Sequence, residues 1–220
     1  MNTNEEIKDY VLKSNTSLVG IVCKDGVIMA GDRRMTAGGR LVMSKDEKKV
    51  KKVNNYLVMS WTGGAADAAL SEKIISAELR LKELKTKTRP TVKEAANLVG
   101  MMLYRSIRTP SMVPHIVGVL VAGFDEDGST HLYTIEPAGG VYEVSQYDAN
   151  FSSGMPFILG LLEKNYRKDI SVKEAIELGK DCIKSAMQRD TASGNGIDVF
   201  TVTKDKIDHA ISEELVSQYK

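Results

Sequence analysis

Residues 16–34 read TSLVGIVCKDGVIMAGDRR, and this stretch decides the fold. Two short apolar runs flank the turn 24–26, Lys-Asp-Gly, a pattern that predicts a β-hairpin. The second strand would return Asp32 and two arginines to the side of Thr16, where the first strand begins. Residues 1–15, MNTNEEIKDYVLKSN, are mostly polar and offer little to a core. The contrast suggests a removable leader before a functional threonine, although a frayed terminus is the simpler alternative.

Three later segments carry polar residues of the kind that catalytic sites use. Lys48-Lys49 enters a predicted strand, residues 151–154 read FSSG, and residues 188–194 read QRDTASG. Taken singly, the lysine pair suits a strand with a solvated face, residues 152–154 suit an ordinary turn, and residues 193–194 suit the end of a helix followed by a loop. Their joint occurrence, in this order along one chain, calls for a common explanation.

Together with the hairpin, these segments resemble the β subunits of the 20S proteasome. That family usually has a Gly-Thr-Thr-Thr-Val-Gly motif at this point, with the mature chain beginning after the first glycine, and an Asp-Arg-Arg type of turn follows. The similarity runs from Thr16 to about Val202, and the archaeal type fits best. It implies a leader at residues 1–15 that is removed by self-cleavage between Asn15 and Thr16, and a single β-type domain at residues 16–220. It also implies an α+β fold, the four-layer αββα sandwich of N-terminal nucleophile hydrolases.

The order of elements agrees with an α+β chain. Hydrophobic periodicity predicts strands, two helices, strands, two helices and a last strand at 199–202, followed by a polar tail. Thr91 with Glu94 and Ser171 with Glu174 are capping-box patterns that open two of the helices.

The two other helices are predicted from different signals. Pro156 can start a helix after the FSSG turn. The remaining helix begins near Ala65, after Gly63-Gly64. Its apolar stripe would face the core and consists of Leu70, Ile74, Ala77, Leu81 and Leu84.

A threonine hydroxyl is a poor nucleophile unless a base removes its proton. A free α-amino group has a pKa of about 7.7–8.0, so an N-terminal threonine carries its own base. The resemblance assigns Thr16 as nucleophile, Lys49 as the lysine that lowers the pKa of its hydroxyl, and Asp32 as the partner of that lysine. The loop between Asp32 and the lysine pair is one residue longer than is usual in the family, so Lys48 is the alternative.

The resemblance assigns the other site roles residue by residue. The amine would be positioned by Ser153, Asp190 and Ser193, the backbone N–H of Gly63 would be the oxyanion donor, and Arg34 would brace the turn. Substrate binding falls to Met35, Thr36, Trp61 and Ala65.

The chain departs from the family pattern at several of these positions. Asn15 replaces the glycine that normally precedes the nucleophile, and asparagine is the next most tolerant residue for a strained turn of positive φ. Residues 17–18, Ser-Leu, replace Thr-Thr, and Ser152 replaces a glycine. Trp61 would fill much of the pocket for the side chain that precedes the cut bond. That filling implies either a preference for small side chains or a closed site.

Composition excludes several classes of function. A net charge of +1 over 220 residues gives no reason to expect a nucleic acid or a membrane as partner. The sequence has no apolar run long enough to span a bilayer and no signal-peptide core. Cys23 and Cys182 predict buried free thiols in a reducing compartment, hence the cytoplasm. The isolated His115, His131 and His209 have no ligand spacing, and we expect neither metal nor cofactor.

Three functional hypotheses remain open. The first is a threonine endopeptidase subunit that cuts unfolded proteins into short peptides. The second is a non-catalytic, unprocessed β subunit that only builds the ring, and the third is the related bacterial two-ring peptidase that works with an unfoldase ATPase. For the first two, the resemblance implies other β subunits in stacked seven-membered rings, α rings outside them, and a regulatory ATPase acting through the α ring.

Overall fold

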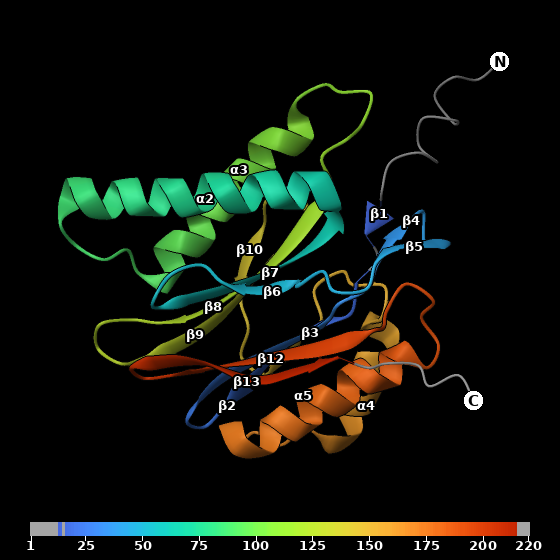
Figure 1. Cartoon of the computed structure of the whole chain (residues 1–220). Coiled ribbons are helices and arrows are strands. Elements are labelled where there is room, and N and C mark those ends of the chain that lie inside the picture. The colour runs from blue at the N-terminus through green and yellow to red at the C-terminus, as the bar shows by residue number, and fades with distance from the viewer. Residues whose placement is uncertain (1–12, 15, 215–220) are drawn as a thin grey trace.

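A computed structural model of the chain describes residues 13–14 and 16–214. Two sheets lie face to face, with two helices on the outer side of each (Figure 1). The first sheet has the order β1-β7-β8-β9-β10, with β6 also pairing with β7, and the second has the order β11-β2-β3-β12-β13. The mixed helix and sheet content confirms the α+β class.

The strands of the first sheet are β1 (Lys13–Ser14), β6 (Val50–Lys52), β7 (Leu57–Gly64), β8 (Val117–Phe124), β9 (Thr130–Ile135) and β10 (Val141–Glu143). Those of the second are β2 (Leu18–Cys23), β3 (Gly26–Asp32), β11 (Tyr147–Asp148), β12 (Gly196–Thr203) and β13 (Lys206–Glu214). A separate pair is formed by β4 (Met35–Ala37) and β5 (Leu41–Ser44). The helices are α2 (Ala65–Thr86) and α3 (Val92–Arg108) beside the first sheet, and α4 (Met155–Asn165) and α5 (Val172–Met187) beside the second (Figure 1).

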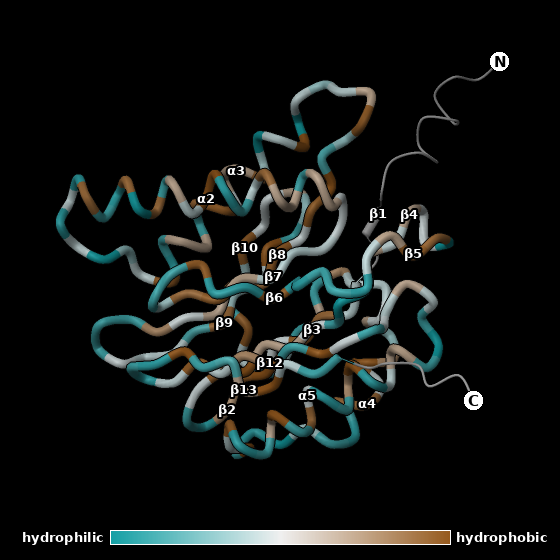
Figure 2. The backbone as a smooth tube through the Cα atoms, viewed as in Figure 1, coloured by the Kyte–Doolittle hydropathy of each residue, from teal (hydrophilic) through white to brown (hydrophobic). Residues whose placement is uncertain are grey.

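The predicted hairpin is confirmed as β2 and β3, which pair from Leu18 with Gly31 to Cys23 with Gly26. Successive side chains of a strand point to opposite faces, so each strand serves two cores. Val27 and Met29 pack between the sheets, whereas Ile28 and Ala30 pack against α4 and α5. Figure 2 shows the apolar segments concentrated in these strands.

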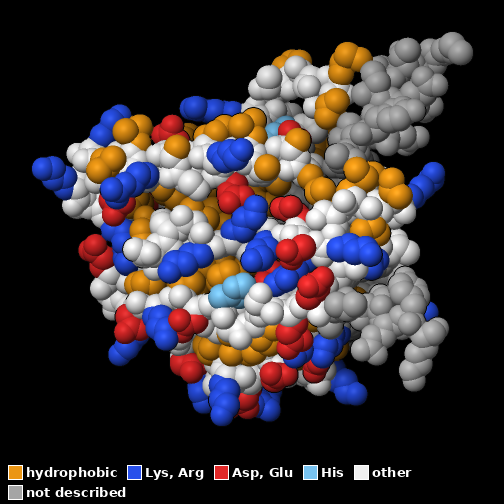
Figure 3. Space-filling view, viewed as in Figure 1, with side chains coloured by type: hydrophobic (Ala, Val, Ile, Leu, Met, Phe, Trp, Pro, Cys, Tyr) orange, Lys and Arg blue, Asp and Glu red, His pale blue; other side chains and the backbone are white. Residues whose placement is uncertain are grey.

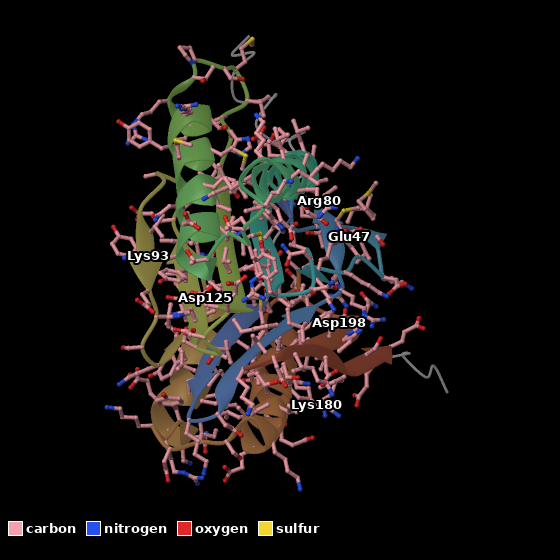
Figure 4. All side chains as sticks on the ribbon, turned by 90° about the vertical axis from the view of Figure 1, so that its left-hand side faces the viewer. Glu47, Arg80, Lys93, Asp125, Lys180 and Asp198 are labelled. Carbon is pink, nitrogen blue, oxygen red and sulfur yellow. The ribbon has the colours of Figure 1, made fainter. Side chains whose placement is uncertain are left out.

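Both predicted capping boxes are confirmed at the starts of α3 and α5. The two helix starts have nearly the same sequence, TVKEA at 91–95 and SVKEA at 171–175. Each also receives a carboxylate from a hairpin turn: the N–H of Val92 donates to Asp125 and that of Val172 to Asp25, at 2.8 Å in both cases. Figure 4 labels Asp125 near the start of α3. These caps fix where the two helices begin on their sheets.

The expectation that the α2 stripe faces the core is wrong. The buried side chains of α2 are Ser71, Ile75 and Leu79, which follow one another at every fourth residue along the helix. The predicted stripe lies outward instead, with Leu70, Ile74, Leu81 and Leu84 exposed. Figure 3 shows apolar side chains gathered along this helix. Apolar spacing therefore predicted the helix correctly but not the side that it buries.

The expectation of a polar C-terminal tail is also wrong over residues 206–214, which form β13. This strand pairs with β12 along nearly its whole length, with an irregularity between Val199 and Phe200. It is an edge strand with mostly exposed or half-exposed side chains, and only Ile207 is buried. An edge strand does not need the apolar alternation by which strands are recognised in a sequence. The short strands β1, β4 and β11 were likewise not predicted.

Candidate active site

Asp32 ends β3 and is completely buried. Its Oδ1 accepts hydrogen bonds from the Lys49 ammonium at 2.7 Å and the Ser17 N–H at 2.9 Å. Its Oδ2 accepts from the N–H groups of Arg34 and Gly194, both at 2.9 Å. Because three of these donors are backbone groups, the carboxylate is held rigidly in one orientation.

Lys49 has 6% of its surface exposed, whereas Lys48 is exposed to solvent. Burial lowers the pKa of the Lys49 ammonium, and the charge and hydrogen bond of Asp32 oppose that shift. The geometry thus favours Lys49 over Lys48 as the partner of Asp32. A buried lysine whose pKa is lowered is a candidate for proton transfer.

Thr16 is buried, with 1% of its surface exposed, and its backbone faces Ser153. The Ser153 hydroxyl lies 3.1 Å from both the nitrogen and the carbonyl oxygen of Thr16. The same hydroxyl is 2.6 Å from Asp190 Oδ2, and the Ser193 hydroxyl is 2.6 Å from that oxygen too. One carboxylate oxygen therefore accepts from two hydroxyls, of which that of Ser153 also contacts the Thr16 nitrogen.

Ser17 belongs to this cluster, although we did not predict it. Its hydroxyl is buried and lies 2.6 Å from that of Ser193. A Cβ placed on Gly154 would come within 1.9 Å of the Ser17 hydroxyl oxygen, so the two chain segments meet without room for a side chain. The only signal in the sequence is that Ser17 directly follows Thr16.

Gly63 has a backbone conformation and a close contact that exclude a side chain. Its φ is +104°, and a Cβ there would lie 2.1 Å from the carbonyl oxygen of Ile116, so no other residue fits. The end of β7 also pairs with β1, where Ser14 lies opposite Gly63 and Lys13 opposite Gly64. Residues just before Thr16 thus occupy the free edge of the strand that carries the candidate oxyanion donor. Asn15 and residues 1–12 lie outside the described residues.

A cavity of about 330 Å³ borders Lys49 and Gly63. Three predicted substrate-binding residues line it, namely Met35, Trp61 and Ala65. Trp61 has only 6% of its surface exposed and packs into the hydrophobic core. The cavity therefore persists, although the indole forms part of its wall. The wall along α2 is formed by small residues, Ala65, Ala66, Ala68 and Ala69.

The other end of this cavity is charged. The ammonium of Lys51 lies 3.0 Å from a carboxylate oxygen of Glu72 and 3.7 Å from one of Glu47. All three side chains are partly exposed, and we predicted none of them as a site residue. A side chain with an apolar stem and a polar tip would match these walls.

Arg34 and Thr36 follow Asp32 in the chain, on either side of Met35. Thr36 is buried on β4 and is not among the residues that line the cavity. The Arg34 guanidinium donates to the carbonyl of Thr191 and to Asn195 Oδ1, each at 2.8 Å. Arg34 therefore connects the β3–β4 turn to the loop that follows Asp190.

Over residues 13–14 and 16–214, no three side chains of His, Cys, Asp or Glu gather in a way that could hold a metal ion. Cys23 and Cys182 are both buried and unpaired, and burial raises the pKa of each thiol to about 12. Within the same ranges, no helix is long and apolar enough to cross a bilayer.

Comparison with known proteins gives one consistent result. The family model described as "Proteasome subunit" matches residues 12–202. "Proteasome subunit beta" of Ferroglobus placidus is 40% identical over 209 residues, covering 95% of this chain and 96% of that protein. The protein of the same name from Archaeoglobus profundus is 39% identical, covering 96% and 94%. "Proteasome subunit beta 2" of Aeropyrum pernix is 38% identical, covering 89% and 85%.

Proposed function

This chain belongs to the proteasome subunit family, and we propose that it is a catalytic β subunit, a threonine-type endopeptidase. Thr16 would be its nucleophile, after removal of residues 1–15. The family and the archaeal β relatives support the β-type assignment. The observation that carries the catalytic proposal is that two hydrogen-bonded groups contact Thr16 and its neighbour Ser17. One is the Lys49–Asp32 pair, and the other is Ser153 with Asp190 and Ser193.

The chemistry would begin on the chain itself. The Thr16 hydroxyl oxygen attacks the carbonyl carbon of Asn15, the Asn15–Thr16 C–N bond breaks, and the nitrogen takes up the proton to become an amine. Water then hydrolyses the resulting ester, which frees the hydroxyl and releases the leader as a carboxylic acid. Lys49 would stabilise the developing charge on the hydroxyl oxygen, and the Gly63 N–H that on the carbonyl oxygen.

The mature site would repeat the same steps on a peptide. The free amine of Thr16 accepts the hydroxyl proton and passes it to the leaving nitrogen of the cut bond, and water hydrolyses the acyl ester. The pairing of β1 with the end of β7 supports this proposal, because a substrate strand could take the same edge after the leader has left.

The second candidate is a non-catalytic subunit that only completes the ring. Asn15 at the cleavage site and Trp61 in the pocket favour it. Against it, the residues that the resemblance assigns to catalysis are of the required type, and Asp32 contacts Lys49 while Asp190 contacts Ser153 and Ser193. A site under no functional demand would be expected to lose some of these contacts.

The rest of the assignment follows from the family. We propose residues 16–220 as a single domain with the four-layer αββα sandwich of N-terminal nucleophile hydrolases. It would assemble with other β subunits in stacked seven-membered rings between α rings, receive unfolded proteins through a regulatory ATPase, and work in the cytoplasm. Two buried, unpaired cysteines support a reducing compartment.

Peptide hydrolysis by particles assembled with an α subunit tests the catalytic proposal. The peptides should differ in the residue before the reporter group, which is small, long and aliphatic, basic or acidic. These side chains test which kind of residue the cavity beside Lys49 accepts. We expect the wild-type particle to cleave at least one of them, and a Thr16→Ala particle of the same size to cleave none. A wild-type particle that cleaves neither these peptides nor an unfolded protein would establish the non-catalytic alternative.

A further inference from the structure

Asn150 is a buried amide that connects the two sheets. It has 2% of its surface exposed and lies in the loop between β11 and α4. Its Nδ2 group lies 3.0 Å from the carbonyl of Val119, 3.2 Å from that of Ile135 and 3.0 Å from the Thr134 hydroxyl. Its Oδ1 accepts a hydrogen bond from the Thr62 hydroxyl at 3.0 Å. These partners lie on β7, β8 and β9, so a loop of the second sheet is bound to the centre of the first.

The backbone at this point is strained. Asn150 has φ of +34° and Phe151 has φ of +25°, a conformation that residues other than glycine adopt rarely. Such residues persist where surrounding contacts hold them in place. Here the Asn150 N–H donates to Asp148 Oδ1 at 2.6 Å, and the Thr134 hydroxyl donates to the same oxygen at 3.2 Å. The amide side chain and this carboxylate therefore hold one turn from both sides.

The strained turn leads directly to the reaction centre. Ser153 follows Asn150 by three residues, and its hydroxyl contacts the Thr16 nitrogen. Asp148 pairs with Gly20 on β2, the strand that begins two residues after Thr16. On the other sheet, Thr62 directly precedes Gly63, the candidate oxyanion donor. Asn150 thus contacts both structural elements that must be aligned for the chemistry.

We propose that Asn150 is a positioning residue, which sets the place of Ser153 relative to Thr16 and Gly63 by clamping its loop to the first sheet. This inference rests on the proposed catalytic function. An amide is needed at this position because two carbonyl oxygens face one end of the side chain and a hydroxyl donor faces the other. Neither a carboxylate nor an aliphatic side chain of the same size supplies a donor and an acceptor together.

Asn150→Asp is the direct test, since it keeps the shape of the side chain and places an oxygen opposite the Val119 and Ile135 carbonyls. In assembled particles we expect kcat for a peptide to fall about tenfold, as for the loss of one hydrogen bond that positions Ser153. KM should stay within about twofold of the wild-type value. The ratio of variant to wild-type kcat should rise as the pH falls, because a protonated carboxyl regains one donor. A residue that serves stability alone would lower the melting temperature and leave kcat and its pH profile unchanged.

Ser152→Ala is the matched control, because Ser152 is buried two residues away and its hydroxyl has no partner among the described residues. We expect its kcat to equal that of wild type within about twofold, since no hydrogen bond is lost. If Asn150→Asp particles fail to assemble, Thr134→Val removes two bonds of the clamp from a point on β9 and should lower kcat about threefold.

Amide hydrogen exchange in residues 149–154 tests the clamp without using activity. Exchange should be faster in Asn150→Asp than in wild type and in Ser152→Ala. If wild type hydrolyses nothing, the proposed function fails while the exchange result still decides the clamp. Equal exchange in all three particles, or unchanged kcat in Asn150→Asp, would overturn the inference.

Discussion

The two sides of Thr16 are held in different ways. On one side, Asp32 ends a regular strand, and three backbone N–H groups and Lys49 fix its carboxylate. On the other side, Ser153 lies on a loop in which two earlier residues, Asn150 and Phe151, have positive φ. The first side is built into the sheet, whereas the second depends on side-chain contacts. We therefore expect substitutions on the Asp32 side to affect the chemistry most, and substitutions in the loop to have graded effects.

Asp32→Asn should have the largest effect. An amide in place of the carboxylate removes the negative charge that opposes the lowering of the Lys49 pKa by burial. It also places an N–H₂ group where two of the four donors now meet a carboxylate oxygen. We expect kcat to fall by at least about 10³, within the range for loss of a positioned proton-transfer group. Self-cleavage should slow as well, which intact mass would reveal. A kcat within tenfold of wild type, in particles of normal size, would contradict the role of the sheet side.

Ser153→Ala should have a smaller effect on the loop side. It removes one hydroxyl that contacts the Thr16 nitrogen and Asp190, while Ser193 keeps its own bond to that carboxylate. One hydrogen bond is worth about 1–1.5 kcal/mol, so loss of this hydroxyl should lower kcat by at least about tenfold. Single-turnover acylation of assembled particles would measure it. A loss as large as that of Asp32→Asn would remove the contrast between the two sides.

Asp148→Asn should alter the pH dependence of stability. Burial raises the pKa of Asp148, so the folded chain disfavours its charged form. The resulting penalty is absent below the unfolded-state pKa, about 3.9, and becomes complete as the pH rises through the folded-state value. The amide retains an acceptor for the Asn150 N–H, so the variant should melt higher than wild type at pH 7, by roughly 2–4 °C for each 1 kcal/mol of penalty removed, and should show no gain at pH 3.5. A gain of equal size at both pH values would contradict this explanation.

Phe151→Asn should have the smallest effect. Phe151 is exposed and has φ of +25°, and asparagine tolerates positive φ better than phenylalanine does. We expect a gain of about 0.5–1 kcal/mol in the free energy of unfolding from relief of this strain. Since the clamp through Asn150 remains, kcat should stay within twofold of wild type. A loss of stability measured by denaturant unfolding would show that the exposed ring has a partner in the assembled particle.

Local signals predicted much of the fold and of the Asp32 side. The hairpin turn at 24–26 and the boxes at Thr91 and Ser171 depend on neighbours within four residues, so the sequence reveals them directly. The Asp32–Lys49 pair came from resemblance, and the structure brings those residues together.

Features that depend on distant contacts were not predictable in the same way. The face that α2 buries is decided by the sheet beneath it, and β13 forms because β12 offers an edge. Asn150 is one polar residue in a loop, and its partners come from three strands that are distant in sequence. No spacing rule connects such residues.

The most direct test of the account is the intact mass and N-terminal sequence of this chain after co-expression and assembly with an α subunit. We predict a chain that begins at Thr16, because the proposed function makes Thr16 a nucleophile that frees its own amine in spite of Asn15. Particles carrying Thr16→Ala should retain residues 1–15. A wild-type chain that stays full length in assembled particles would contradict the account, because the Thr16 nitrogen would remain an amide and could not act as the base.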